Sequence, residues 1–168
     1  MKPSALRWWL AAGLMAALGA ARALDAPTAL AVVVASGQEQ TVNPADLALI
    51  YRRKKLFWDG GARINPVNLL ASDPLRQLFS RAILGKSPAE MEGYWNTMYF
   101  NGISPPHVLA SPEAVLRFVA QTPGAIGYVP FCDADARVKV VLALTTAGPI
   151  SAAAASSACP KHGTPPGG

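Results

Sequence analysis

The sequence predicts a single α/β domain, on three observations. A continuous apolar run rich in valine, from Ala29 to Ala35, is typical of a buried strand in an α/β sheet. Four later segments each begin with a capping residue followed by proline, which is a common start of a helix. Two further strand patterns follow the last of these helices. The 168 residues, 51% hydrophobic and 15% charged, exclude a disordered polar chain and leave no room for two full domains.

Residues 1–23 have the three-part pattern of a secretory signal peptide. Lys2 and Arg7 supply positive charge, an apolar run of 14 residues extends from Trp8 to Ala21, and small residues surround a cleavage position after Ala23. An uncleaved anchor is the alternative, but a membrane-spanning helix needs about 20 apolar residues. We therefore expect cleavage, export to a bacterial periplasm and no stable membrane insertion of the mature protein.

Part of the positive charge of the chain lies in this segment. The formal net charge is +5, from 15 Lys and Arg against 10 Asp and Glu. Cleavage removes Lys2, Arg7 and Arg22 and leaves 12 basic residues, so the mature chain carries about +2. Such a weak net charge does not support a nucleic-acid partner.

The elements of the mature domain follow in order after the first strand. Helices are expected to begin at Asn43-Pro44, Asp73-Pro74, Ser87-Pro88 and Ser111-Pro112. Strands are expected at Ile64–Leu69, Gly124–Val129 and Val138–Leu144. About four helices should therefore flank the sheet.

The second and third of these helices carry apolar residues at spacings of three and four, so each is expected to bury one face. Gly85 is a C-terminal cap for the second helix, and Ser87 with Glu90 forms a capping box at the start of the third. The apolar face of the third helix consists of Met91, Tyr94, Trp95, Met98 and Tyr99.

From Thr145 onward the chain becomes rich in Ala, Ser, Gly and Pro. Such a segment has little side-chain area to bury. We therefore expect an α/β domain over residues 24–145 and a disordered, low-complexity tail over residues 146–168.

The two cysteines of the mature chain are Cys132 and Cys159. An oxidising compartment permits a disulfide between them. Two unpaired thiols are equally compatible with the sequence, because Cys159 falls in the predicted tail. Their spacing does not fit a CxxC redox motif or a metal site.

The sequence contains no recognisable catalytic constellation. Its two histidines, His107 and His162, fall in a loop and in the tail, and there is no GxSxG elbow, GxGxxG motif or phosphate-binding P-loop. No His, Cys and Asp residues cluster at the spacing of metal ligands. We expect a protein that is not an enzyme and that uses no cofactor or metal.

Two polar segments are candidates for binding. The basic run Arg52, Arg53, Lys54 and Lys55 is either a solvated helix end or a surface for an anionic partner. The helix start at Asp73 would suit an oxyanion, with Ser72 and Arg76 as additional donors. The Asp73 carboxylate is, however, expected to cap that helix, and it would then occupy the free N–H groups.

Several segments occur in an order that is informative in combination: Phe57–Gly61 (FWDGG), Ile64–Asn68 (INPVN), Pro74–Arg76 with Phe79, Leu84–Pro88 (LGKSP), Tyr94-Trp95 and Pro123–Val129 (PGAIGYV). In this combination the chain, from about Leu30 to Leu144, resembles the short relatives of phosphate-type substrate-binding proteins of ABC transporters, which have the type 2 periplasmic-binding fold. The resemblance implies an exported, non-enzymatic single lobe, similar to the second lobe of the full-length proteins.

The resemblance also implies a ligand. In full-length relatives two lobes clamp an oxyanion, using a Ser-Gly-Thr turn at a helix start and a nearby Arg. The turn corresponds here to Ser72-Asp73-Pro74, and Asn68 lies in the stretch where the upstream Arg would be. Ser72 and Arg76 are therefore the expected ligands of phosphate or another oxyanion.

A second interpretation remains open. A degenerate single lobe would act as an interaction module in the envelope without a small-molecule ligand. It would bind an envelope or transporter protein through Arg52–Lys55, or through an apolar surface where the missing lobe would have packed.

Overall fold

The computed structural model describes residues 29–157 and Cys159. The predicted signal peptide and residues 160–168 of the predicted tail lie outside the described residues. Within the described part, no helix has both the length and the apolar character needed to cross a membrane.

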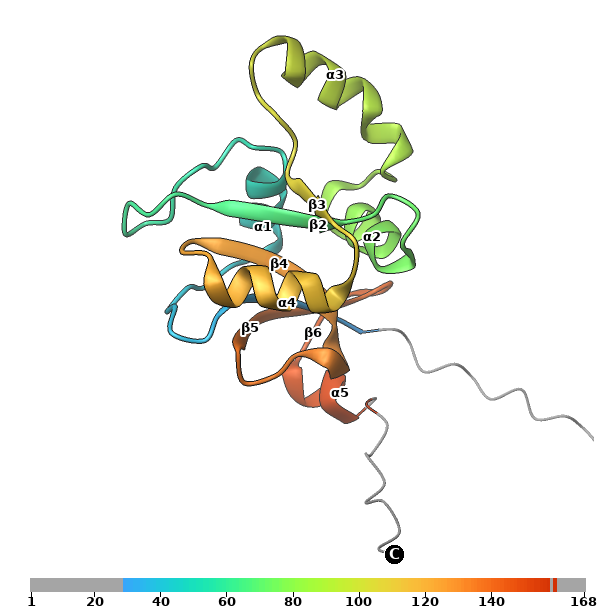
Figure 1. Cartoon of the computed structure of the whole chain (residues 1–168). Coiled ribbons are helices and arrows are strands. Elements are labelled where there is room, and N and C mark those ends of the chain that lie inside the picture. The colour runs from blue at the N-terminus through green and yellow to red at the C-terminus, as the bar shows by residue number, and fades with distance from the viewer. Residues whose placement is uncertain (1–28, 158, 160–168) are drawn as a thin grey trace, which may run out of the picture.

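The domain is built on one mixed sheet of six strands (Figure 1). From edge to edge these are β3 (His107–Leu109), β2 (Asn65–Leu69), β4 (Ala125–Pro130), β1 (Leu30–Ala35), β5 (Val138–Thr145) and β6 (Gly148–Ile150). β1 is antiparallel to both β4 and β5, whereas β2 is parallel to β4 and β3. The predicted α/β class is therefore confirmed.

β1 lies inside the sheet, as its apolar run predicts. Its residues from Leu30 to Val34 are all completely buried. A strand that pairs on both edges and is covered on both faces has no solvent-exposed side, which explains why its sequence does not alternate between apolar and polar residues.

The helices begin where the sequence predicts. They are α1 (Pro44–Tyr51), α2 (Pro74–Phe79) with a π-helical continuation (Ser80–Leu84), a 3₁₀ turn (Ala89–Met91) that leads into α3 (Glu92–Phe100), and α4 (Pro112–Gln121). Gly85 ends the π-helical segment with a left-handed φ of 68°. The predicted capping box also forms: the N–H of Ser87 donates to the Glu90 carboxylate at 2.8 Å, and the N–H of Glu90 donates to Oγ of Ser87 at 3.3 Å.

The two faces of the sheet are covered differently, as β4 illustrates. Gly127 faces α4, and an added Cβ would lie 2.5 Å from Cγ1 of Val115, so glycine allows this helix to pack close to the sheet. The next residue, Tyr128, points to the opposite face, where it packs against Phe79 of α2 and Tyr51 of α1.

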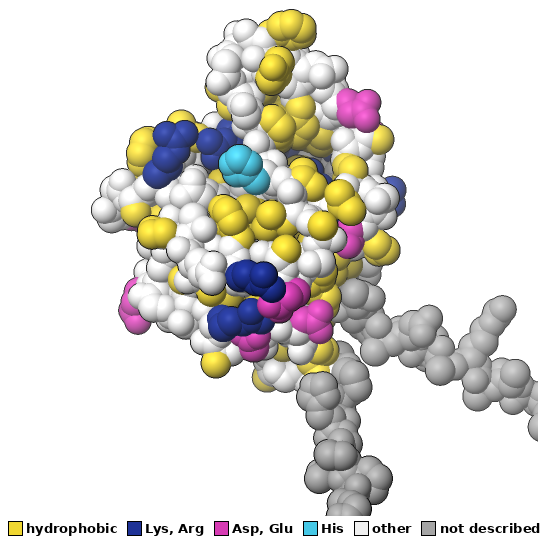
Figure 2. All heavy atoms as spheres, in the orientation of Figure 1, with side chains coloured by type: hydrophobic (Ala, Val, Ile, Leu, Met, Phe, Trp, Pro, Cys, Tyr) yellow, Lys and Arg dark blue, Asp and Glu magenta, His cyan; other side chains and the backbone are white. Residues whose placement is uncertain are grey.

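The expectation that the third predicted helix buries one face is wrong. Within α3, Tyr94, Trp95 and Met98 are only half-buried, and Tyr99 and Phe100 are 68% and 87% exposed. The helix projects away from the sheet (Figure 1), and several hydrophobic side chains lie on the surface of this projecting part (Figure 2). Tyr94 and Trp95 still pack against the core, so the periodic pattern is present but the face that it marks is covered only in part.

The structure also differs from the expected disorder after Thr145. Residues 148–150 form β6, which pairs with β5, and Ala152–Ser157 form α5. α5 packs against β5 and the 3₁₀ turn Phe131–Asp133, with Ala155 completely buried. Backbone pairing and one small buried side chain order this segment, although it offers little side-chain area.

Candidate functional site

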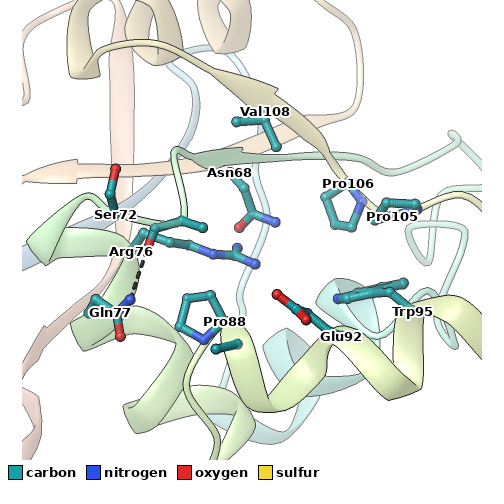
Figure 3. Close-up of a pocket in the computed structure, with 12 residues that line it drawn as sticks. Asn68, Ser72, Arg76, Gln77, Pro88, Glu92, Trp95, Pro105, Pro106 and Val108 are labelled. Carbon is teal, nitrogen blue, oxygen red and sulfur yellow. Dashed lines mark hydrogen bonds between the residues drawn. The ribbon is translucent and has the colours of Figure 1, made fainter.

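A pocket of about 470 Å³ lies beside the C-terminal end of β2 (Figure 3). α2 forms one wall, the segment from Pro88 into α3 forms a second, and the loop before β3 forms a third. The lining residues are Asn68, Ala71, Ser72, Arg76, Gln77, Pro88, Ala89, Glu92, Trp95, Pro105, Pro106 and Val108. Both residues expected to bind an oxyanion, Ser72 and Arg76, line this pocket.

Arg76 is the main electrostatic feature of the pocket. Its side chain leaves α2 and points into the space between Asn68 and Glu92 (Figure 3), yet the residue is only 7% exposed. Nη1 is buried and has no hydrogen-bond partner among the described residues. The guanidinium also makes no ion pair with any carboxylate in that part of the chain. A buried charge of this kind costs free energy unless a ligand or water compensates it.

Asn68 adds a second donor beside the guanidinium. It is 3% exposed, and its Oδ1 accepts a hydrogen bond of 3.1 Å from the hydroxyl of Tyr128. That hydroxyl accepts the N–H of Leu69 at 3.3 Å, so its proton is directed to Asn68. The amide nitrogen Nδ2 of Asn68 is therefore left without a described acceptor and is available to the pocket.

An aromatic cluster holds Tyr128 and α2 in place. Phe79 stacks on Tyr128 with ring centroids 4.2 Å apart, and Tyr51 lies 4.5 Å from Phe79. Burial raises the pKa of both tyrosines above the ordinary value, and the nearby Arg76 only partly opposes this. Both hydroxyls stay protonated at neutral pH, so Tyr128 remains a donor to Asn68.

The start of α2 is capped by the protein itself. Oδ1 of Asp73 accepts the N–H of Leu75 at 2.8 Å, as expected for the capping interpretation. The hydroxyl of Ser72, at the edge of the pocket, points away from Arg76 (Figure 3). The guanidinium and the Asn68 amide, not the helix start, are therefore the groups placed to receive an anion.

Glu92 and Trp95 form the wall opposite α2 (Figure 3). The carboxylate of Glu92 points toward Arg76 but does not pair with it, and it adds negative charge to the pocket. The sequence pattern assigned Trp95 to a buried helix face. No feature of the sequence marked Glu92 as a residue of a binding site. Asn68 had one signal in the sequence, its place in the stretch where the upstream Arg of the full-length relatives would lie.

The basic run is separate from the pocket. Nη2 of Arg52 donates to the carbonyl of Leu84 at 2.8 Å, and Nζ of Lys55 lies 3.2 Å from Asp46. Burial and the nearby Arg63 lower the pKa of Arg53. Of the four residues only Lys54 is exposed. Arg52 and Lys55 already make contacts within the domain.

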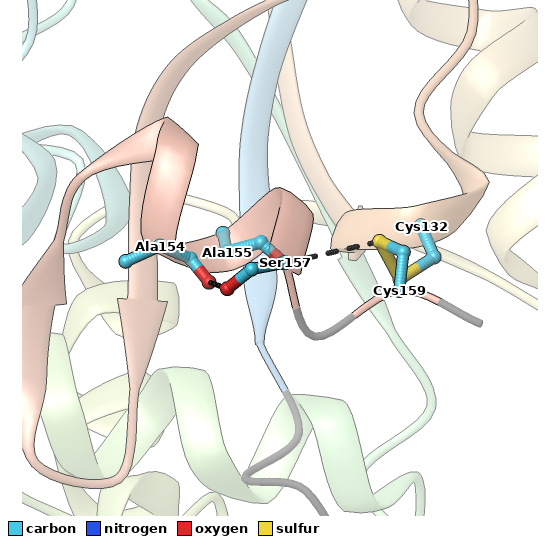
Figure 4. The surroundings of a disulfide bond; sticks show 5 residues. All are labelled: Cys132, Ala154, Ala155, Ser157 and Cys159. Carbon is cyan, nitrogen blue, oxygen red and sulfur yellow. Dashed lines mark hydrogen bonds between the residues drawn. A yellow bond between two sulfur atoms is a disulfide. The ribbon is translucent and has the colours of Figure 1, made fainter. Parts of the chain in front are cut away.

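Cys132 and Cys159 form a disulfide (Figure 4). The bond ties the 3₁₀ turn Phe131–Asp133 after β4 to Cys159, two residues beyond the end of α5, and it closes a loop with a sequence separation of 27. No group of three His, Cys, Asp or Glu side chains is arranged for a metal ion within the described residues.

No protein-family model matches the sequence, and no curated protein matches it significantly. Solved structures do match. A protein of Clostridium perfringens described as a phosphate ABC transporter substrate-binding protein, with bound phosphate, aligns over 69% of this chain and 45% of its own, with 18% identity and a TM-score of 0.57. An ABC-type phosphate transport receptor of Vibrio cholerae aligns over 69% and 46%, with 21% identity and a TM-score of 0.56.

A third match is PstS of Borrelia burgdorferi, over 64% of this chain and 42% of its own, with 20% identity and a TM-score of 0.50. The resemblance to phosphate-type substrate-binding proteins is thus confirmed at the level of the fold. These neighbours are binding proteins rather than enzymes. The chain spans less than half the length of each of these three structures.

Proposed function

We propose that the protein is an exported domain related to phosphate-type substrate-binding proteins and that it binds an oxyanion in the Arg76 pocket. The fold is that of binding proteins for phosphate uptake, and the pocket contains a cation without an acidic partner among the described residues. Nothing in this proposal requires a reaction, a cofactor or a metal.

The buried guanidinium is the observation that carries the proposal. A guanidinium presents its N–H groups in a planar fork that matches two oxygens of a phosphate, sulfate or carboxylate. Nη1 of Arg76 has no partner among the described residues, and Nδ2 of Asn68, which lines the same pocket, has no acceptor there either. An oxyanion between them would satisfy both groups and neutralise the buried charge.

The same site also limits the affinity. Asp73 occupies the N–H of Leu75, and the Glu92 carboxylate repels an incoming anion. With two donor side chains and one opposing charge, we expect dissociation constants of about 0.1–1 mM for inorganic phosphate.

Calorimetric titration of the purified protein with phosphate and with sulfate tests the proposal. We expect saturable binding that is lost in Arg76→Met, a variant that removes the charge and keeps an unbranched apolar side chain. Arg117→Met, at a side chain that is 64% exposed on α4, is the matched control and should bind as the wild type does. Absence of binding heat at about 10 mM of either anion would rule out the oxyanion site.

Export is the second part of the proposal. We expect the signal peptide to be removed after Ala23, so that the mature protein in the periplasmic fraction begins at Leu24. N-terminal sequencing of the protein from that fraction checks this. Retention of Met1 in the cytoplasmic fraction would exclude it.

The alternative function, an interaction module in the envelope, has one structural observation in its favour. Tyr99 and Phe100 are 68% and 87% exposed on α3, which is more apolar surface than a helix of an isolated domain needs. A partner that co-purifies from the envelope fraction, and is lost on Phe100→Ser or on reversal of Arg52 and Arg53 to Glu, would favour this function. Such a result together with an anion titration that shows no binding would replace the first proposal.

A further inference from the structure

The Arg76 pocket is larger than a free inorganic oxyanion requires. Its volume of about 470 Å³ falls in the range of pockets that hold small organic molecules. A tetrahedral anion bound to Arg76 and Asn68 would fill only the polar end of this space. The remainder would hold either water or another part of the same ligand.

The composition of that remaining space favours an apolar group. Trp95, Pro105 and Pro106 lie together on the side of the pocket opposite Ser72 (Figure 3). Pro88 and Val108 extend this apolar lining. These side chains offer few hydrogen bonds to ordered water, whereas an indole face and proline rings pack well against a flat ring.

Trp95 packs against the hydrophobic core but is only half-buried there. Its indole contacts Tyr94 edge to face, with ring centroids 5.0 Å apart, but the residue remains partly exposed on a helix that packs poorly on the sheet. A ligand that covers the indole would remove this apolar surface from water.

We propose that the ligand of the Arg76 pocket is an organic oxyanion, in which a single phosphate, phosphonate or carboxylate group is joined to a flat apolar body. The anionic group binds Arg76 and Asn68, and the body packs against Trp95 and the prolines. This inference rests on the proposed function, because it takes the oxyanion site at Arg76 as given and adds the class of molecule that carries the oxyanion.

The test compares two phosphate esters that differ only in their organic group. The purified protein is titrated calorimetrically with methyl phosphate and with phenyl phosphate at the same pH and ionic strength. We expect phenyl phosphate to bind about tenfold more tightly, because its ring covers the indole and the prolines while the anionic group is unchanged.

Variants of Trp95 test whether this difference in affinity between the two esters arises in the pocket. Trp95→Ala should remove the preference for phenyl phosphate and leave the affinity for methyl phosphate within about twofold of the wild type. Trp95→Leu preserves apolar bulk and covers the case in which the alanine variant does not fold. Phe100→Ala, an aromatic position on the same helix that does not line the pocket, is the matched control and should preserve the preference.

The outcomes separate this inference from the proposed function. Equal affinity for the two esters in the wild type, or a preference that is undiminished in Trp95→Ala or in Trp95→Leu, overturns the organic ligand and leaves the oxyanion site in place. If neither ester nor inorganic phosphate binds, the oxyanion site itself is excluded.

Discussion

The hydroxyl of Tyr128 donates a hydrogen bond to Oδ1 of Asn68 across 60 positions of sequence, at 3.1 Å. The same hydroxyl accepts the backbone N–H of Leu69, so a single oxygen connects β4 to β2 beside the pocket. This arrangement fixes the orientation of the Asn68 amide, which lines the pocket together with Arg76. The core of the domain therefore determines the polarity of the proposed site.

Tyr128→Phe removes this connection without removing the ring. Oδ1 of Asn68 and the N–H of Leu69 would lose their partner in a buried environment, and we expect a loss of about 1–3 kcal/mol in the free energy of unfolding. Oxyanion affinity should also fall, because the Asn68 amide is no longer held in orientation. Urea denaturation and calorimetry measure the two effects, and unchanged affinity would show that Asn68 does not contribute a donor.

Arg76→Met should abolish oxyanion binding without lowering the free energy of unfolding. Because the guanidinium is buried without a described ion-pair partner, replacing it by an unbranched apolar side chain should leave the protein in anion-free buffer as stable as the wild type, or more stable by about 1 kcal/mol. Urea denaturation in buffer without phosphate or sulfate checks this. A loss of several kcal/mol would indicate that Arg76 is a structural residue with a partner in the fold.

Glu92→Gln should strengthen binding. The carboxylate points toward Arg76 and opposes an anion there, so its neutralisation should raise affinity for phosphate about two- to fivefold at low ionic strength. The gain should diminish as salt is added. Glu39→Gln, at an exposed residue outside the pocket, is the control. Weaker binding in Glu92→Gln would assign Glu92 a direct role in holding the ligand.

The disulfide should stabilise the C-terminal part of the domain. Closing a loop with a sequence separation of 27 restricts the unfolded chain, and the loop-entropy model gives about 3.5 kcal/mol for this length. We expect Cys132→Ala with Cys159→Ala to unfold at lower urea and to expose the amides of α5 to hydrogen exchange first. Identical unfolding midpoints for this double variant and the oxidised wild type would contradict the expectation.

The surface network of Arg137 should make stability depend on pH. Hydrogen bonds from this guanidinium hold the pKa of Glu113 and of Asp135 below the ordinary carboxyl range. Because the pKa is lower in the folded state, the two carboxylates stabilise the fold above about pH 4 and lose this contribution as the pH falls further. The stability lost between about pH 7 and about pH 3 should therefore be smaller in Arg137→Gln than in Lys139→Gln, an exposed control on β5. Equal losses would show that the network does not contribute.

Much of the fold could be predicted because the first strand, the helix starts and the helix cap are each determined by residues close together in the sequence. The apolar run of β1, the four helix starts and the left-handed cap at Gly85 each depend on a few neighbouring residues. β3 was missed because it is three residues long, with His107 and Val108 exposed, and so shows no apolar pattern. β6 and α5 were missed because their order comes from pairing with β5, from a disulfide and from a single small buried side chain, Ala155, and not from an apolar pattern.

The candidate site was predicted in part. Ser72 and Arg76 follow from the resemblance, but the availability of the Asn68 amide depends on Tyr128, and no sequence spacing encodes that contact. The place of Trp95 depends on how α3 leaves the body of the domain. Helical periodicity shows that α3 has an apolar side but not whether another element covers it.

The claim that an oxyanion binds at Arg76 is tested most directly by nuclear magnetic resonance of ¹⁵N-labelled protein during a phosphate titration. We predict saturable shifts of the side-chain Nε–Hε signal of Arg76 and of the Nδ2 protons of Asn68, with the Nε–Hε signal of Arg117 unchanged. If the Arg76 and Asn68 signals do not move up to about 20 mM phosphate, or move no more than that of Arg117, the protein has no oxyanion site at this pocket.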